Sequence, residues 1–203
     1  MGLFGLTGVE AREPQGGFEW TVECGVYVCR IDHAEVVTAK TSGNKMLHIE
    51  YSIAEGPHAG FGADSQYPPY VNVMLEPESQ LPFAAHRLNC ISASNSAGPV
   101  TFDAVKVVDD GNSQLLVGKL VGFVVEKELY TRGPNSKRAG EDAERNNVVR
   151  WLTVQEARQG YVVKADGTKV LIEVPPVRDS RKPKPAGAPA QAPQAMSDED
   201  IPF

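Results

Sequence analysis

MLHIEYSIA, residues 46–54, is the segment that decides the class of fold. Its large apolar side chains occupy every second position, at Leu47, Ile49, Tyr51 and Ile53, and more polar residues fill most of the positions between them. A period of two residues places the first set on one face of a β-strand and the second set on the other. We therefore predict a half-buried strand in this segment.

Further strands are predicted on both sides of it. Residues 20–31 (WTVECGVYVCRI) form an earlier strand-like run. The turn sequence TSGN at residues 41–44 would connect this run to residues 46–54 as a hairpin. The later strands are predicted at residues 70–75, 115–130 and 147–154, and residues 161–174 fit a further hairpin about Asp166 and Gly167.

One helix interrupts the strands, at residues 79–95. Leu81, Ala84, Leu88 and Ile91 lie there at helical spacing, while residues 101–108 fit either a helix or a strand. Five strand regions with a helix between the third and the fourth follow the order of an OB-fold, a five-stranded, partly open Greek-key barrel. We predict a mainly β, OB-fold-like domain over residues 1–174, with a generic β-sandwich as the alternative.

The composition changes sharply after residue 174. Residues 175–197 are rich in Pro, Ala and Gln, with almost no large apolar side chains, which predicts a disordered linker. The last six residues combine acidic and apolar side chains, which suit a small hydrophobic pocket rimmed by basic residues on a partner protein. The predicted partner-binding tip consists of Asp198, Glu199, Asp200, Ile201, Pro202 and Phe203.

Composition also limits the classes of function. The 203 residues carry a formal net charge of −6. No apolar run reaches the roughly 18 residues of a membrane-spanning helix, and residues 1–6 lack the basic region of a secretory signal. We therefore expect a cytoplasmic protein. The three cysteines, Cys24, Cys29 and Cys90, make no metal-binding spacing, so we expect reduced thiols and neither a metal nor another cofactor.

Known catalytic motifs do not occur in the chain. Residues 111–119 (GNSQLLVGK) resemble a phosphate-binding loop only superficially, because six residues separate the glycines and Leu120 replaces the required Ser or Thr. There is no nucleophile elbow, no zinc-protease helix and no pair of cysteine and histidine suited to catalysis. We predict that the chain is not an enzyme.

The two loops that flank the binding face of an OB-fold carry cations in this sequence. Acidic residues in the second loop, residues 131–146, partly offset its positive charge. Exposed aromatic rings could stack on bases, and Phe61 and Tyr130 are further candidates for such stacking. The predicted DNA contacts are Lys40, Lys45, His48, Tyr67, Tyr70, Arg132, Lys137, Arg138, Arg145, Arg150 and Trp151.

The ending DEDIPF resembles the C-terminal tip of bacterial single-stranded DNA-binding proteins. Residues 18–162 resemble, more loosely, phage and prophage single-stranded DNA-binding proteins. The second resemblance rests on Gly25-x-Tyr27, Arg30-Ile31, TSGNKML at residues 41–47, Glu55-Gly56, Gly118-Lys119-x-Val121-Gly122 and Glu156-x-Arg158-x-Gly160.

These resemblances imply a function in a bacterial cell or a phage-infected host. The domain would bind and protect single-stranded DNA without sequence preference during replication, recombination and repair, and the tip would recruit proteins of those pathways. The alternative is an OB-like adaptor of a replisome that does not bind DNA. The sequence leaves the oligomeric state open, a homo-oligomer included.

Overall fold

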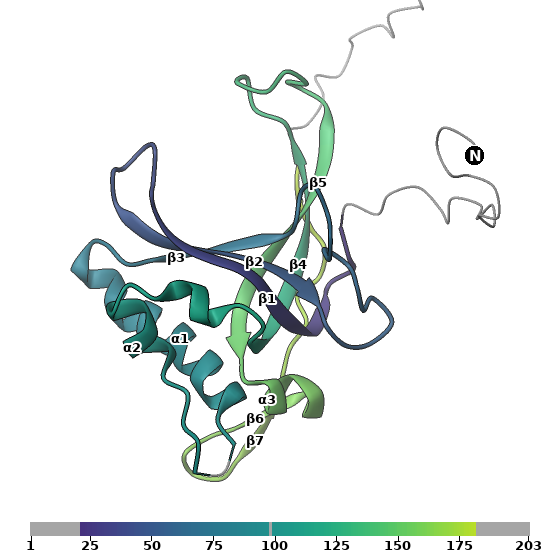
Figure 1. Cartoon of the computed structure of the whole chain (residues 1–203). Coiled ribbons are helices and arrows are strands. Elements are labelled where there is room, and N and C mark those ends of the chain that lie inside the picture. Colours follow the sequence, from purple (N-terminus) through teal and green to yellow (C-terminus); the bar gives the residue numbers. More distant parts are fainter. Residues whose placement is uncertain (1–20, 98, 182–203) are drawn as a thin grey trace, which may run out of the picture.

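The computed structural model describes residues 21–97 and 99–181 and is mainly β (Figure 1). Within these ranges no helix combines the length and the apolar character needed to cross a membrane. The elements in chain order are β1 (Gly25–Thr38), β2 (Lys45–Ile53), β3 (Tyr70–Met74), the 3-10 helix η1 (Glu78–Gln80), α1 (Leu81–Asn95), α2 (Ala104–Asp109), the 3-10 helix η2 (Ser113–Leu116), β4 (Leu120–Thr131), β5 (Asp142–Leu152), α3 (Val154–Gln159), β6 (Tyr161–Val163), β7 (Lys169–Leu171) and β8 (Arg178–Ser180).

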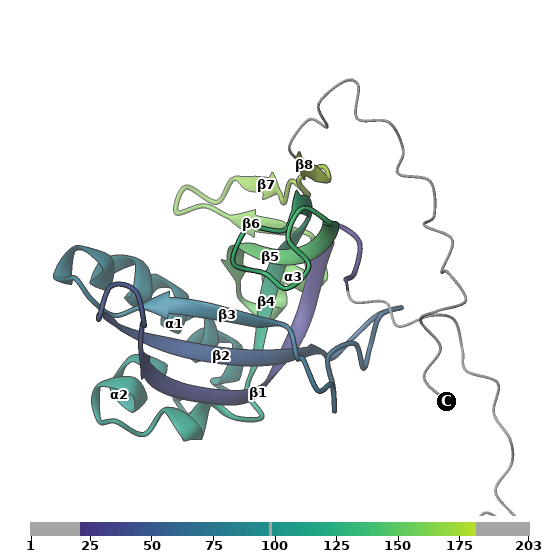
Figure 2. The same ribbon diagram turned by 90° about the horizontal axis from the view of Figure 1, so that it is seen from above.

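The main sheet has the strand order β3-β2-β1-β4-β5 and is antiparallel along this path. The central strand β1 pairs with β4 through residues 25–30 and with β2 through residues 29–38. A register shift between Ile31 and His33 interrupts its pairing with β2, and such a bulge bends a strand. Figure 2 shows the result, in which β2 and β3 run across the direction of β4 and β5.

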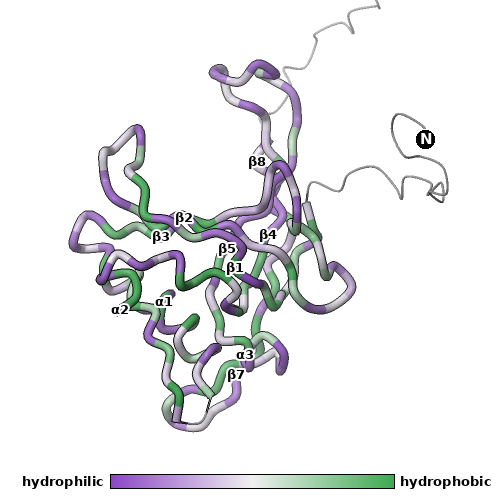
Figure 3. Tube along the Cα trace, viewed as in Figure 1, coloured by the Kyte–Doolittle hydropathy of each residue, from purple (hydrophilic) through white to green (hydrophobic). Residues whose placement is uncertain are grey.

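The core lies between the strands and helices α1 and α2, which cover one face of β1, β2 and β3 (Figure 1). Leu47, Ile49 and Tyr51 of β2 are buried there, which confirms the alternation seen in the sequence. The Phe123 ring of β4 packs edge to face on Tyr51, with ring centroids 5.0 Å apart. In Figure 3 hydrophilic residues gather at the tips of the β1–β2 and β4–β5 hairpins.

The structure confirms a mainly β fold with an antiparallel sheet and helix α1 between β3 and β4. Residues 101–108, whose sequence fits either a helix or a strand, contribute to α2, and residues 161–174 contain the hairpin of β6 and β7. A closed barrel is not confirmed. Among the described residues no pairing joins β3 to β5, and the sheet stays open there.

The predicted linker begins too early at residue 175. Residues 178–180 form β8, which pairs in parallel with residues 128–130 of β4. The Ser180 hydroxyl also donates a hydrogen bond of 2.6 Å to the carboxylate of Glu128. The remainder of the predicted linker, residues 182–197, and the predicted tip, residues 198–203, lie outside the described residues.

Helix α3 packs against β4 so closely that only glycine fits at position 122. A Cβ atom on Gly122 would lie 2.8 Å from the Cβ of Ala157 and 2.9 Å from the carbonyl oxygen of Thr153. The side chain of Thr153 and that of Glu156 form a capping box that fixes the start of the helix. The backbone near Gly122 therefore has little freedom to move away.

We predict that Gly122→Ala lowers the free energy of unfolding by about 1–3 kcal/mol because it overpacks this contact. Gly133→Ala is the matched control, since nothing lies within 4 Å of its added Cβ, and it should change stability by less than about 1 kcal/mol. Urea unfolding followed by circular dichroism measures both. Equal midpoints for the two variants would contradict close packing of α3 on β4.

Candidate nucleic-acid interface

A groove of about 930 Å³ separates the two ends of the open sheet. One wall is formed by the loop before β3 and the first residues of β3. The other wall is formed by residues 144–148 of β5, and the end of β4 completes it. The lining residues are 61–65, 67–72, 130, 132 and 144–148. The groove therefore occupies the place where pairing of β3 with β5 would close a barrel.

Two exposed tyrosines dominate the wall before and at β3. The side chains of Tyr67 and Tyr70 are 67 % and 59 % exposed, in contrast to the buried Tyr27 and Tyr51. Pro68 and Pro69 separate them, and proline restricts the backbone of this segment. Exposed, flat aromatic faces are the surfaces on which single-stranded nucleic acids stack their bases.

His48 extends this aromatic surface onto the polar face of β2. Its ring lies beside that of Tyr70, with centroids 5.2 Å apart and an angle of 40° between the planes. The Nδ1 atom of His48 is 2.8 Å from the Oδ1 atom of Asn72, the residue paired with it on β3. The polar side chains of β2 and β3 therefore continue from the groove across this face of the sheet.

One arginine of β5 and another that directly follows β4 supply positive charge on the opposite wall. The Arg145 guanidinium lies over the Tyr130 ring, 4.9 Å from its centroid, and its Nε donates to Glu128 at 2.8 Å. The Nε of Arg132 is buried and has no hydrogen-bond partner within the described part of the chain. A buried guanidinium donor without a partner is costly. Arg132 also lines the groove, where its guanidinium contributes positive charge.

Glu128 is a buried carboxylate that holds this wall together. It accepts hydrogen bonds from the Ser180 hydroxyl, the Arg145 guanidinium and the Asn147 amide, at 2.6, 2.8 and 2.8 Å. These three donors, with Ser180 contributing most, lower the pKa of Glu128 from 4.5 to about 2. The ionised carboxylate thus joins β4, β5 and β8 and fixes Arg145 beside the groove.

Acidic side chains offset the arginines of the groove. Asp64 and Glu144 line it together with Arg132 and Arg145, so two negative charges stand against two positive ones. Hydrogen bonds from the Thr21 hydroxyl and the Lys127 ammonium lower the pKa of Glu144, which keeps it ionised. The charged side chains that line the groove therefore sum to no net charge.

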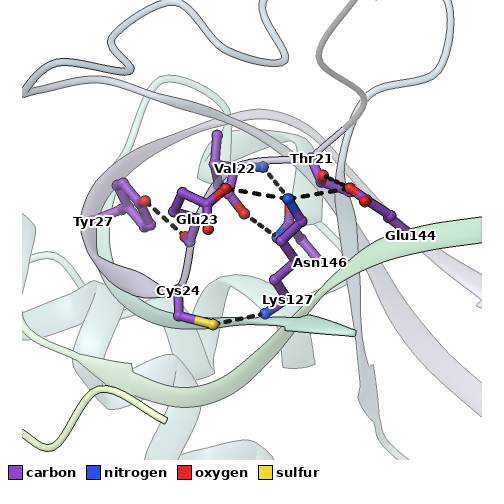
Figure 4. Close-up of polar contacts among 8 residues, drawn as sticks. All are labelled: Thr21, Val22, Glu23, Cys24, Tyr27, Lys127, Glu144 and Asn146. Carbon is purple, nitrogen blue, oxygen red and sulfur yellow. Dashed lines mark hydrogen bonds and ion pairs between the residues drawn. The ribbon is translucent and has the colours of Figure 1, made fainter. Parts of the chain in front are cut away.

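Residues 21 and 22 are fastened to the β5 wall (Figure 4). The Thr21 hydroxyl donates to Glu144 at 2.9 Å. The Asn146 amide accepts from the Val22 nitrogen and donates to the Val22 carbonyl oxygen, both at 2.8 Å. Lys127 adds ion pairs to Glu144 and Glu23 at 3.2 and 3.1 Å. The start of the described chain thus lies directly against groove-lining side chains.

The structure brings together four of the residues predicted from the sequence to contact DNA, and His48 lies beside them. These four, Tyr67, Tyr70, Arg132 and Arg145, line the groove. The predicted cations on the hairpin tips do not line it, although both hairpins project to the same side of the sheet (Figure 1). These cations are Lys40, Lys45, Lys137 and Arg138, of which Arg138 forms a 2.6 Å ion pair with Glu141.

The prediction that Trp151 stacks on bases is wrong. Its side chain is 6 % exposed and packs on Phe123, with ring centroids 4.7 Å apart. A bulge leaves Val149 without a paired residue, because Val124 pairs with Arg150 and Val125 with Val148. This bulge reverses the alternation along β5 and turns Trp151 into the core. Arg150 is exposed but does not line the groove.

Several residues that line or support the groove were not predicted from the sequence. The sequence did contain an indication for Asn146 and Asn147. Asparagine is depleted in strands, so two in a row within a β region indicate that their side chains form specific hydrogen bonds. The sequence contained no such indication for the contacts of Thr21 and Glu128, because their partners lie far away along the sequence, as in the separation of 123 residues between Thr21 and Glu144.

Comparison with known proteins gives one family match. Residues 9–113 match a family model described as protein of unknown function (DUF669). The matched range includes β1, β2, β3 and helices α1 and α2, and with them the tyrosine wall of the groove. No curated protein matches the chain.

We predict that Glu128→Gln destabilises the protein by about 2 kcal/mol at pH 7, because it weakens charge-assisted hydrogen bonds in a buried site. The folded-state pKa of Glu128, about 2, lies below its ordinary value of 4.5. Its contribution to stability is therefore complete above pH 4.5 and disappears as the pH falls from there toward 2.

Urea unfolding of both proteins at several pH values measures this difference. The gap between wild type and Glu128→Gln should narrow as the pH falls through that window. Glu173→Gln is the control, since Glu173 is exposed and forms no ion pair within the described ranges. A gap that stays constant from pH 7 to pH 2 would refute the role assigned to the Glu128 carboxylate.

Proposed function

We propose that this chain, which belongs to the DUF669 family, binds single-stranded DNA in the groove between β3 and β5 with little preference for base sequence. The observation that carries the proposal is that the two walls of one groove differ in chemistry. Tyr67 and Tyr70 line one wall, and Arg132 and Arg145 line the other. Proteins that bind single strands combine these two features, aromatic faces for bases and cations for phosphates.

The order of the strands supports the same proposal. An open sheet of order β3-β2-β1-β4-β5 with a helix between β3 and β4 has the connectivity of an OB-fold. We infer that it is a partly open OB-like barrel. OB-folds bind oligonucleotides over strands 2 and 3, between the loops that join strands 1 to 2 and 4 to 5. The proposed DNA path leaves the groove, crosses His48 and Asn72, and runs toward Lys45.

The expected energetics follow from the composition of the groove. Stacking contributes about 1–3 kcal/mol for each base, so two tyrosines supply about 2–6 kcal/mol. Two phosphate contacts on a single strand give a slope near −1.4 when the logarithm of the association constant is plotted against that of the salt concentration. This dependence on salt is shallow for a nucleic-acid-binding protein because Asp64 and Glu144 offset the arginines.

The C-terminal tip has a separate role in the proposal. Residues 198–203 would recruit proteins of replication, recombination or repair to the DNA held by the domain. The support for this part is the acidic and apolar sequence DEDIPF, which resembles the tip of bacterial single-stranded DNA-binding proteins. The segment lies outside the described residues.

A second candidate function is an OB-like adaptor that binds protein through the same groove. The balance of two carboxylates and two arginines in the groove, together with the net charge of −6, favours it. An adaptor would not bind oligonucleotides even at low salt, which separates the two candidates in one titration.

We predict that labelled oligo-dT binds the full chain and that Tyr70→Ala weakens the binding about tenfold, the loss expected for one stacked base. Arg132→Gln should reduce the affinity for oligo-dT and oligo-dA alike and make the salt slope shallower by about 0.7, the value for one phosphate contact. Fluorescence anisotropy over a salt series measures both effects.

Arg150→Gln is the matched control for Arg132→Gln, since Arg150 is an exposed arginine near the end of β5 outside the groove. Tyr161→Ala serves for Tyr70→Ala, because the Tyr161 ring lies under Lys169 on the β6–β7 hairpin. If the two controls weaken binding and the two groove variants do not, the interface lies elsewhere.

A further inference from the structure

We propose that the residues immediately before Thr21 dock in this groove, with the aromatic rings of Phe18 and Trp20 against the tyrosine wall. The occupant is thus a segment of the chain itself. The inference concerns the protein without any ligand, and it does not depend on what the groove binds.

The described chain begins inside this region. Thr21 and Val22 are 8 % and 3 % exposed. Their hydrogen bonds go to Glu144 and Asn146, two residues that line the groove (Figure 4). Because the Asn146 amide binds both the nitrogen and the carbonyl oxygen of Val22, it fixes the position and direction of the backbone at the β5 wall.

Chain geometry then limits where the preceding residues can lie. Consecutive Cα atoms are about 3.8 Å apart, and three residues span at most about 11 Å. A segment of three residues before Thr21 therefore reaches at most about 11 Å from it. Because Thr21 itself contacts groove-lining residues, docking in the groove would need no long connection.

The two walls match what this segment offers. In an extended segment, residues two apart point to the same side, so in the proposed arrangement Phe18 and Trp20 would share one side and Glu19 would take the other. The wall across from β5 presents the rings of Tyr67, Pro68, Pro69 and Tyr70, on which aromatic side chains pack well. The outer edges of β3 and β5 have no strand partner among the described residues, so they can pair with an extended backbone.

The family match also includes this segment. It begins at residue 9 and runs through the tyrosine wall without a break. The segment before Thr21 therefore lies within the region that the family model describes, together with the surface on which we place it. If the proposed function holds as well, DNA and this segment compete for one groove.

The fluorescence of Trp20 tests the docking without any DNA. The chain has two tryptophans, so Trp151→Phe leaves Trp20 as the only one. Its emission should be shifted to the blue, and acrylamide should quench it several-fold less than free N-acetyltryptophanamide. Tyr70→Ala and Asn146→Ala, each in that background, should shift the emission to the red and raise the quenching. Tyr161→Ala is the control and should change neither.

A second measurement tests the docking if the Trp151→Phe variant does not fold. Incorporation of 5-fluorotryptophan into the otherwise unchanged chain gives two ¹⁹F resonances, and Trp20→Phe identifies that of Trp20. Its chemical shift should respond to Asn146→Ala and differ from that of the urea-unfolded chain. A Trp20 that is quenched like the free compound, or whose ¹⁹F shift equals the unfolded value, overturns the docking. Because no nucleic acid is present, either result is independent of the proposed DNA binding.

Discussion

Strand β1 pairs with both β2 and β4, and the groove follows from that constraint. Only residues 29 and 30 of β1 pair with β2 and β4 at once. Beyond them the bulge near Asp32 turns the strand away, and β2 and β4 diverge with their outer neighbours. The strands β3 and β5 therefore end up as the two walls of a space instead of a paired seam. Local pairing of β1 thus determines a feature at the far edges of the sheet.

The local part of this fold was predictable from the sequence. Alternation in residues 46–54 and the spacing of Leu88 and Ile91 in α1 identify a strand and a helix, because each pattern matches the period of its element. The burial of Trp151 was not predictable, since one extra residue at the β5 bulge switches the face of the sheet to which every later side chain of β5 points. Closure of the sheet depends on angles between strands, which no local pattern encodes.

In the candidate site, too, local features were predictable from the sequence and long-range contacts were not. Tyr67 and Tyr70 stand two prolines apart in a loop, and Arg132 and Arg145 flank another loop, so composition alone identified both walls. The contacts that hold those walls in place could not be predicted from local sequence patterns. Glu128 joins three strands, and Asn146 holds a residue 124 positions earlier. Sequence patterns therefore identified side chains that line the groove better than those that hold them in place.

The hydrogen bond from Ser180 to Glu128 has a consequence for where the folded unit ends. Composition places the boundary at residue 175, where prolines begin. A chain cut there would lose β8, and one carboxylate oxygen of a nearly buried acid would lose its 2.6 Å donor. A chain that stops after Arg181 keeps that donor. The contacts of Glu128 thus extend the described fold to residues 178–180, within a stretch whose composition is typical of a linker.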